Sequence, residues 1–252
     1  MLPSTERIPE WAKTALRHVV SCRAILYHGN ERFCPVCGKQ SRRFVRHGLI
    51  PREDAECPRC GALERHRFLW LYLLRKTNLF DGTPRKVLHV APERCLEARL
   101  KKMLGEHYVT ADLSRRRHPM VKMDITHIEY PDQSFDVIYC SHVLEHVPDD
   151  RRAMSEFSRV LKDDGWALLL VPITVEKTFE DPSIIDPKDR LRVFGQADHV
   201  RRYGLDYFDR LREAGFSVET IRVSDVASSE EAVRMGLTPA CGDIYCCTKA
   251  KR

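Results

Sequence analysis

Two cysteine pairs carry the plainest chemical signature of this 252-residue sequence. Cys34 and Cys37 form one C-x-x-C pair, Cys57 and Cys60 form the other, and glycine follows each pair directly. The segment between the pairs has the length, ~15–20 residues, that is typical of four-cysteine zinc sites. Glycine lets the chain turn so that backbone N–H groups point at the thiolates. Four thiolates close a tetrahedral shell, so the pattern predicts a structural zinc ion rather than a catalytic one.

A redox role for either cysteine pair is disfavoured, because redox C-x-x-C motifs occur singly on a βαβ scaffold. Basic side chains surround the pairs and allow two interpretations, an anion-binding surface or a solvated face. These residues are Arg42, Arg43, Arg46, His47, Arg65, His66 and Arg67. The net charge of +6, from 42 basic and 36 acidic residues, is too modest to decide between the two.

Three histidines have side chains suited to proton transfer. His142 and His146 lie in the run FDVIYCSHVLEHV, and His199 lies in GQADHVRRYG. Histidine titrates near neutral pH, so it can accept a proton without special tuning. Each of the three is therefore a candidate general base.

Alternating strands and helices must position these side chains. Apolar, β-favouring runs that end abruptly in polar residues predict buried parallel strands at 86–90, 108–112, 120–124, 135–141 and 166–173. Helical periodicity is expected after the first strand, over 149–161 and over 205–214. The pattern ends in a hairpin-like pair of strands at 216–223 and 243–249. Ligands of open α/β sheets bind at the carboxyl ends of such strands.

Four segments are expected along the chain. An amphipathic helix over 9–21 lies in the first segment, and an apolar helix over 63–76 links the zinc module to the main domain. The expected boundaries are an N-terminal helix (1–29), a zinc module (30–62), a linking helix and turn (63–84) and an α/β domain (85–252).

The composition excludes several classes of protein. With 43% hydrophobic and 31% charged residues, the sequence is typical of a globular protein and not of a disordered one. Its longest apolar runs, 69–74 and 167–173, fall far short of the ~20 residues that cross a bilayer. The N-terminus lacks the basic start and apolar core of a signal peptide. We therefore expect a cytoplasmic protein whose ten cysteines are reduced or metal-bound.

The order of these elements resembles the class I S-adenosylmethionine-dependent methyltransferases. The resemblance rests on the acid Asp112 at the end of the second strand, the MDIT run at 123–126, the FDVIYCSHVLEHV block and the RVLKDDGWALLLVP block. It implies an α/β fold with a Rossmann-like, doubly wound seven-stranded sheet that contains one antiparallel strand. It also implies S-adenosylmethionine across the ends of the first and fourth strands.

The resemblance assigns cofactor-binding roles residue by residue. Asp112 would hold the ribose hydroxyls, Asp124 and Ile125 would flank the adenine, and Ser141 and His142 would line the methionine end. An acid ~20 residues beyond the first strand has the spacing that ribose binding requires.

The first loop departs from the family, which has an acid followed by a glycine-rich run. This sequence has His89, Ala91, Pro92 and Glu93 there instead. S-adenosylmethionine has no phosphate to cradle, so a tighter loop can serve, with Glu93 accepting a hydrogen bond from the cofactor's ammonium. The alternative is that Glu93 only favours a helix N-terminus.

The segment 174–204 is expected to be a lid over the methyl acceptor, because the family usually contacts its acceptor there. His199 in this lid is the preferred base, with His142 and His146 as alternatives. The accompanying side chains suit an acceptor that carries phosphate or carboxylate. They are Arg192, Arg201, Arg202 and Tyr203.

The run SHVLEH resembles enzymes that act on small molecules, sugars or lipids. An RNA methyltransferase that docks RNA through its zinc module is an alternative, which zinc ribbons, arginine clusters and positive charge permit. The aromatic-proline tetrad of nucleic-acid methyltransferases does not follow the fourth strand. A binding protein that kept the fold and lost the cofactor is the other alternative, suggested by the glycine-free loop.

Overall fold

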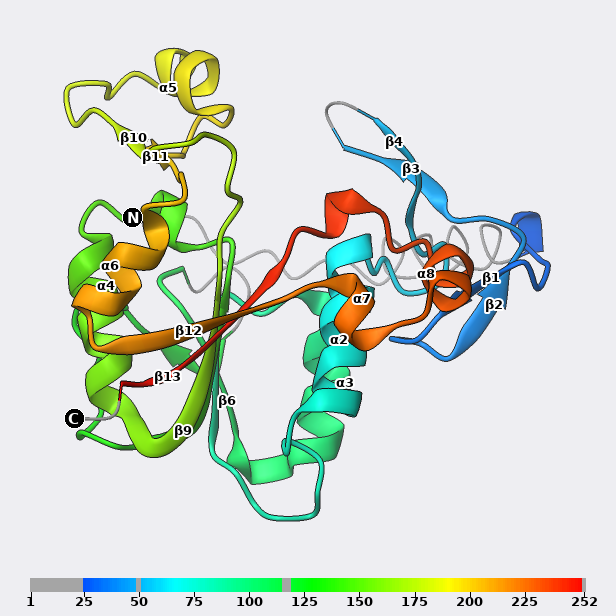
Figure 1. The fold of residues 1–252 in the computed structure, drawn as a ribbon, viewed down its shortest axis with the longest axis horizontal. Coiled ribbons are helices and arrows are strands. Elements are labelled where there is room, and N and C mark those ends of the chain that lie inside the picture. Colours follow the sequence, from blue (N-terminus) through cyan, green and yellow to red (C-terminus); the bar gives the residue numbers. More distant parts are fainter. Residues whose placement is uncertain (1–24, 49–50, 115–118, 251–252) are drawn as a thin grey trace, which may run out of the picture. The chain divides into compact units, whose positions relative to one another are not determined.

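The computed structural model describes residues 25–48, 51–114 and 119–250. Contacts divide the chain into two compact units, Met1–Thr77 with Val223–Cys241, and Asn78–Arg222 with Gly242–Arg252. Both units are drawn in Figure 1. The expected helix over 9–21 lies outside the described residues.

The first unit contains two small antiparallel hairpins. Strand β1 (Arg32–Cys34) pairs with β2 (Lys39–Ser41), and β3 (Val45–His47) pairs with β4 (Arg52–Glu56). The helix α2 (Glu64–Lys76) follows, almost as the apolar run predicts, and it buries Phe68, Leu69 and Trp70. Three short elements complete the unit: α7 (Val223–Val226), α8 (Ser229–Met235) and η4 (Pro239–Cys241).

The residues of α7, α8 and η4 group with the cysteine module, whereas the sequence placed them in the α/β domain. Two contacts with α2 explain the grouping. Arg75 donates hydrogen bonds to the Val226 carbonyl at 2.9 Å and to Glu231 Oε1 at 2.7 Å. The sequence signal for α8 is its capping box, in which Ser228 accepts from the Glu231 N–H and Glu231 accepts from the Ser228 N–H.

A fully buried arginine ties the module together. Arg67 donates to the carbonyls of Ala55 and Ala62, both at 2.8 Å, and to those of Met235 at 2.6 Å and Gly236 at 3.0 Å. Burial lowers the pKa of Arg67, although the nearby Cys34 raises it. Arg67 and the buried His66 therefore do not belong to an anion-binding surface, whereas Arg42, Arg43, Arg46 and His47 are exposed.

The second unit is built on a seven-stranded sheet with the order β12-β13-β9-β8-β5-β6-β7. Its strands are β5 (Val87–Val90), β6 (Tyr108–Asp112), β7 (Val121–Lys122), β8 (Phe135–Ser141), β9 (Leu161–Leu170), β12 (Phe216–Ile221) and β13 (Ile244–Lys249). Strand β13 is antiparallel to both of its neighbours, and the other pairings are parallel. The predicted fold class is confirmed.

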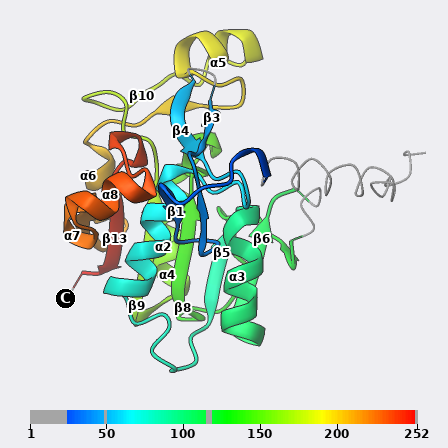
Figure 2. The ribbon, with the colours of Figure 1, turned by 90° about the vertical axis from the view of Figure 1, so that its right-hand side faces the viewer.

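Helices cover both faces of this sheet. On one face, α4 (Asp150–Val160) and α6 (Tyr207–Glu213) bury Phe157 and Leu211 in a core with Leu88, Ile138 and Leu169. The helix α3 (Arg94–Leu104) lies beside β5 and β6, as Figure 2 shows. Alternate strand residues point to opposite faces, so near-continuous burial along β5 and β8 follows from this double cover.

Two strands differ from expectation. The DDG turn expected before the fifth strand lies within β9, which begins at Leu161. A register shift accommodates it, because Phe135 pairs with Leu161 and Val137 pairs with Trp166. Strand β7 is shorter than the predicted segment.

The segment after β9 contains β10 (Phe179–Glu180), α5 (Pro187–Phe194) and β11 (Arg201–Arg202), with β10 and β11 paired antiparallel. Two backbone stretches of this segment lie so close together that one position must be glycine. A Cβ on Gly204 would lie 2.4 Å from the carbonyl carbon of Lys177. No helix among the described residues has the length and apolar character needed to cross a bilayer.

Candidate active site and metal centres

The carboxyl ends of β5, β6 and β8 meet at one edge of the sheet. Val90 of β5 is in register with Ala111 of β6 and with Cys140 of β8. The Ala91 N–H donates to the Ala111 carbonyl at 2.7 Å. Ala91, Asp112 and Ser141 therefore come together from three strand ends, as expected for a ligand site of an open parallel sheet.

Two residues that follow strands at this edge have left-handed backbone conformations. Ala91 has φ 49° and His142 has φ 54°. This conformation costs an L-residue with a Cβ ~1–2 kcal/mol, whereas glycine adopts it freely. Such strain gathers at functional sites. Ala91 thus makes, at some energetic cost, the sharp turn for which a glycine-rich loop is suited.

Glu93 is fixed at the start of α3 by two buried partners. Its Oε1 accepts a hydrogen bond from Tyr139 Oη at 2.7 Å, and its Oε2 contacts His89 Nε2 at 2.8 Å. His89 Nδ1 contacts Tyr108 Oη at 2.6 Å. Burial raises the pKa of Tyr108, so its hydroxyl stays protonated. Glu93 is half-buried and is not hydrogen-bonded through its side chain as an N-cap.

His89 is 0% exposed, so its side chain orients Glu93 and does not itself reach a ligand. This geometry revises the expectation that His89 binds the cofactor. The physical reason is that successive side chains of a strand point to opposite faces of the sheet. The His89 side chain lies on one face, packed between Tyr108 and Tyr139.

The acids expected at the ribose and adenine lie at the ends of β6 and β7. Asp112 is half-buried, and its Oδ1 accepts from the Ser114 N–H at 2.8 Å. Asp124 is exposed, and its Oδ1 accepts from the N–H of Thr126 at 2.9 Å and from its hydroxyl at 2.7 Å. These two bonds lower the pKa of Asp124. Ile125 is 5% exposed and belongs to the core.

The three predicted histidines gather around Glu145. His142 Nδ1 lies 3.3 Å from Glu145 Oε1. The rings of His146 and His199 meet edge to face with centroids 4.6 Å apart. The loop that carries His199 is held there because the Val200 N–H donates to the Glu145 carbonyl at 2.9 Å.

Two polar atoms in this cluster are buried and without a hydrogen-bond partner in the described part of the chain. They are Oε2 of Glu145 and Nε2 of His199. Burial lowers the pKa of His199, and the neighbouring His146 lowers it further. The cluster therefore presents a buried carboxylate oxygen and a neutral imidazole nitrogen that still need a partner.

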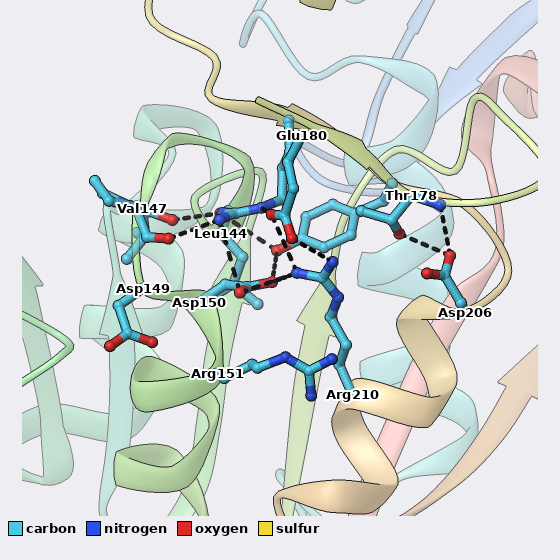
Figure 3. Close-up of polar contacts among 12 residues, drawn as sticks. Leu144, Val147, Asp149, Asp150, Arg151, Thr178, Glu180, Asp206 and Arg210 are labelled. Atoms are coloured by element: carbon cyan, nitrogen blue, oxygen red, sulfur yellow. Dashed lines mark hydrogen bonds and ion pairs between the residues drawn. The ribbon is translucent and has the colours of Figure 1, made fainter. Parts of the chain in front are cut away.

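Arg201 and Tyr203, expected to bind the acceptor, belong instead to a buried polar network, whose Asp150, Glu180 and Arg210 are labelled in Figure 3. Arg201 donates to Glu180 Oε2 at 2.8 Å, and Tyr203 Oη donates to Asp150 Oδ2 at 2.6 Å. Arg210 donates to Asp150 at 2.9 Å and to Glu180 at 2.8 Å. Arg201 also donates to the carbonyls of Leu144, Val147 and Pro148.

This network leaves Arg201 3% and Tyr203 1% exposed, so neither side chain is available to an acceptor. Their role is to anchor β10 and β11 to the start of α4. Arg202 and Arg192 are the accessible members of the predicted set. Arg202 donates to Thr174 Oγ1 at 3.2 Å, and the exposed Arg192 pairs with Asp189 at 3.0 Å.

The four cysteines predicted as metal ligands form one cluster. The Sγ atoms of Cys34 and Cys60 lie 3.7 Å apart, and those of Cys37 and Cys57 lie 3.8 Å apart. A tetrahedral zinc ion with Zn–S bonds of ~2.3 Å requires sulfur atoms ~3.8 Å apart. The thiolate set therefore fits zinc in number, chemistry and spacing.

Comparisons with known proteins agree with this fold. Residues 95–169 match a family model described as "Methyltransferase domain". The chain is 30% identical over 119 residues to the uncharacterized methyltransferase YcgJ of Bacillus subtilis (strain 168), covering 45% of this chain and 44% of YcgJ. It is 26% identical over 119 residues to methyltransferase GfsG of Streptomyces halstedii, covering 46% of this chain and 40% of GfsG.

A crystal structure of the YcgJ protein from Bacillus subtilis aligns with a TM-score of 0.46 at 18% identity, over 72% of this chain and 98% of that one. The matched part spans less than half the length of YcgJ and of GfsG in the two sequence comparisons. Residues 95–169 are therefore similar to a methyltransferase domain, and the resemblance predicted from the sequence is confirmed.

Proposed function

We propose that this protein transfers a methyl group from S-adenosylmethionine, which lies along the carboxyl edge of β5, β6 and β8. One observation carries the proposal: Ala91 and His142 turn the chain sharply at the ends of adjacent strands, beside the half-buried Asp112. Left-handed residues at two neighbouring strand ends are a pattern of ligand sites rather than of cores.

The cofactor contacts follow from the positions of these side chains. Asp112 accepts hydrogen bonds from the ribose hydroxyls, and the exposed Asp124 borders the adenine. Glu93, held in place by His89 and Tyr139, accepts a hydrogen bond from the cofactor's ammonium. The remaining proposed contacts are made by Ala91, Ser141 and His142.

The acceptor is proposed to be a small molecule, sugar or lipid with an anionic group, covered by the segment 174–204. Arg202 and Arg192 supply the positive charge, since Arg201 and Tyr203 are engaged in the buried network. The acceptor's reacting atom lies near the histidine cluster, where His199, or else His142 or His146, receives its proton.

The proposal is tested by incubating the protein with methyl-labelled S-adenosylmethionine and separate pools of small metabolites, lipids and RNA. We expect label in a small-molecule or lipid fraction that survives RNase, and at least tenfold less label with the Asp112→Ala variant at a limiting cofactor concentration. Label in RNA would overturn the proposed acceptor class. A protein that neither binds the cofactor nor transfers label would overturn the function.

We also infer that the four-cysteine cluster holds one structural zinc ion. Its support is the thiolate spacing, together with the charge of the nearby Arg67, which offsets the negative charge of four thiolates. The ion would stabilise a module whose hairpins are too short to fold alone. Metal analysis of the purified protein should find zinc that a thiol-blocking reagent releases. Iron in its place would contradict this inference.

A further inference from the structure

We propose that Glu145, His146 and His199 form a second metal site, for a divalent first-row ion. One ligand atom from each of the three residues lies within 4.8 Å of the others. Donors around one ion at ~2.0–2.2 Å are roughly 3–4 Å apart, so side-chain shifts of about 1 Å complete the site. Glu145 is 2% and His199 is 7% exposed.

The unpartnered atoms are the strongest argument for an ion. Glu145 Oε2 and His199 Nε2 have no hydrogen-bond partner within the residues that the structure describes. A buried carboxylate oxygen without a partner is destabilising by more than a typical hydrogen bond contributes. A cation between these two atoms satisfies both, and it neutralises the buried carboxylate.

The Nδ1 side of the His146 imidazole is already held, as metal-binding histidines require. His146 Nδ1 faces Asp198, at 3.3 Å from its carbonyl oxygen and 3.4 Å from its carboxylate. This outer contact fixes the tautomer of His146 that leaves its Nε2 as a ligand.

Backbone contacts at the end of β8 position the donor residues of this site. His142 is held in its left-handed conformation at the end of β8, and Arg201 fixes the following turn through the carbonyls of Leu144 and Val147. These contacts present His142 and Glu145 on one side, while the β11 segment brings His199 to the other. Two elements distant in sequence thus build one donor set.

Imidazole and carboxylate donors favour ions such as Zn²⁺, Mn²⁺, Fe²⁺ and Co²⁺ over Mg²⁺ or Ca²⁺. The role of the ion rests on the proposed methyl transfer. An acceptor hydroxyl bound to the ion becomes more acidic and releases its proton to solvent. The acceptor oxygen then forms the C–O bond as the methyl's C–S bond breaks, and that electron pair stays on sulfur. A ligated His199 is not the base in this scheme.

The test uses Mn²⁺, because this hard ion binds thiolates poorly and leaves the zinc module undisturbed. Binding of Mn²⁺ to the full chain is followed by electron paramagnetic resonance. We expect one site per chain in the native protein. We expect Glu145→Gln and His199→Ala each to weaken it at least tenfold, while the exposed control His107→Ala leaves it unchanged.

Binding of S-adenosylhomocysteine is measured on the same samples and should be similar in all four proteins, which verifies folding. If the native protein binds S-adenosylhomocysteine but not Mn²⁺, or if both ligand variants bind Mn²⁺ as the native protein does, the metal site is refuted and the proposed function stands. If Mn²⁺ binds as expected but S-adenosylhomocysteine does not, the proposed function fails and the metal site stands.

Discussion

At the scale of single residues, the site combines strain, burial and unsatisfied polar atoms. Ala91 and His142 adopt left-handed conformations, and Glu145 and His199 keep buried atoms without partners among the described residues. Each of these features costs stability on its own. These costly features occur together along one edge of one sheet. A binding site explains this clustering, whereas a purely structural arrangement does not.

His199 is the residue on which the acceptor end depends most. We expect His199→Ala to lower turnover on the order of a hundredfold or more, because it removes either the base or a metal ligand. Affinity for S-adenosylmethionine should be nearly unchanged. The measurement is steady-state kinetics on the acceptor found by labelling, with and without added Mn²⁺. Full turnover in this variant would contradict both roles.

At the scale of elements, buried ion pairs hold the segment after β9 in addition to its apolar contacts. Arg201 and Arg210 bridge Asp150 at the start of α4 to Glu180 of β10. Thr178 adds a second connection by donating its hydroxyl to Asp206 at 2.7 Å. This anchoring fixes β10 and β11, while most of α5 is exposed.

Glu180 gives this anchor a pH dependence. Burial raises the pKa of Glu180, but hydrogen bonds from Arg210 and Arg201 outweigh it and lower the pKa from 4.5 to about 2. Between these values the unfolded chain binds more protons than the folded one, so the contribution to stability is lost as the pH falls through this window. The side chain is 38% exposed, so solvent screening keeps the contribution modest.

We therefore expect Glu180→Gln to lower the Tm at pH 7 by roughly 2–4 °C. The difference from the native protein should shrink as the pH falls from 7 towards 3. Thermal unfolding at several pH values measures this, with Asp189→Asn on the exposed α5 as the control. An equal Tm difference at every pH would show that the carboxylate charge of Glu180 is not what holds the segment.

At the scale of the whole molecule, the chain contains an α/β unit and a cysteine module, and the module includes residues from two distant parts of the sequence. Arg67 is the link within that module, because its guanidinium binds carbonyls of the segment before α2 and of α8 and its C-cap. Gly236 is required there, since its φ is +61° and an added Cβ would lie 3.0 Å from Phe44.

Replacing Arg67 by lysine should destabilise the module by about 3 kcal/mol, because a lysine cannot donate to four carbonyls at once. Hydrogen exchange in the segment 223–241 is the measurement, and it should accelerate markedly. The exposed Arg42→Lys is the matched control and should change nothing. Unchanged protection in Arg67→Lys would show that the buried hydrogen bonds are not what fixes this segment.

The sequence predicts the repetitive parts of the fold well and the long-range insertions poorly. Buried strands such as 87–90 and 135–141 are evident because a double-covered parallel strand is apolar on both faces. Residues 223–241 are missed because their helices are short and their partner, Arg67, lies far away in the chain. Local periodicity carries no information about such a contact.

The same limit applies to the site. Cysteine spacing and the acid Asp112 are local signals, and the structure brings the cysteines together as predicted. The gathering of the histidines around Glu145 depends on the path of the chain after β9, and the burial of Arg201 depends on Asp150 and Glu180. An arginine in a charged segment is easily taken for a ligand-binding residue until its carboxylate partners are known.

Calorimetry with the purified full chain tests most directly whether Asp112 and its neighbours at the carboxyl edge bind S-adenosylmethionine. A carboxylate hydrogen bond to a ribose hydroxyl contributes roughly 1.5–3 kcal/mol. We predict saturable binding of one cofactor per chain, weakened at least tenfold in Asp112→Ala, with unfolding of the variant unchanged. No binding to the native protein, or equal affinity in a well-folded variant, would contradict this cofactor site.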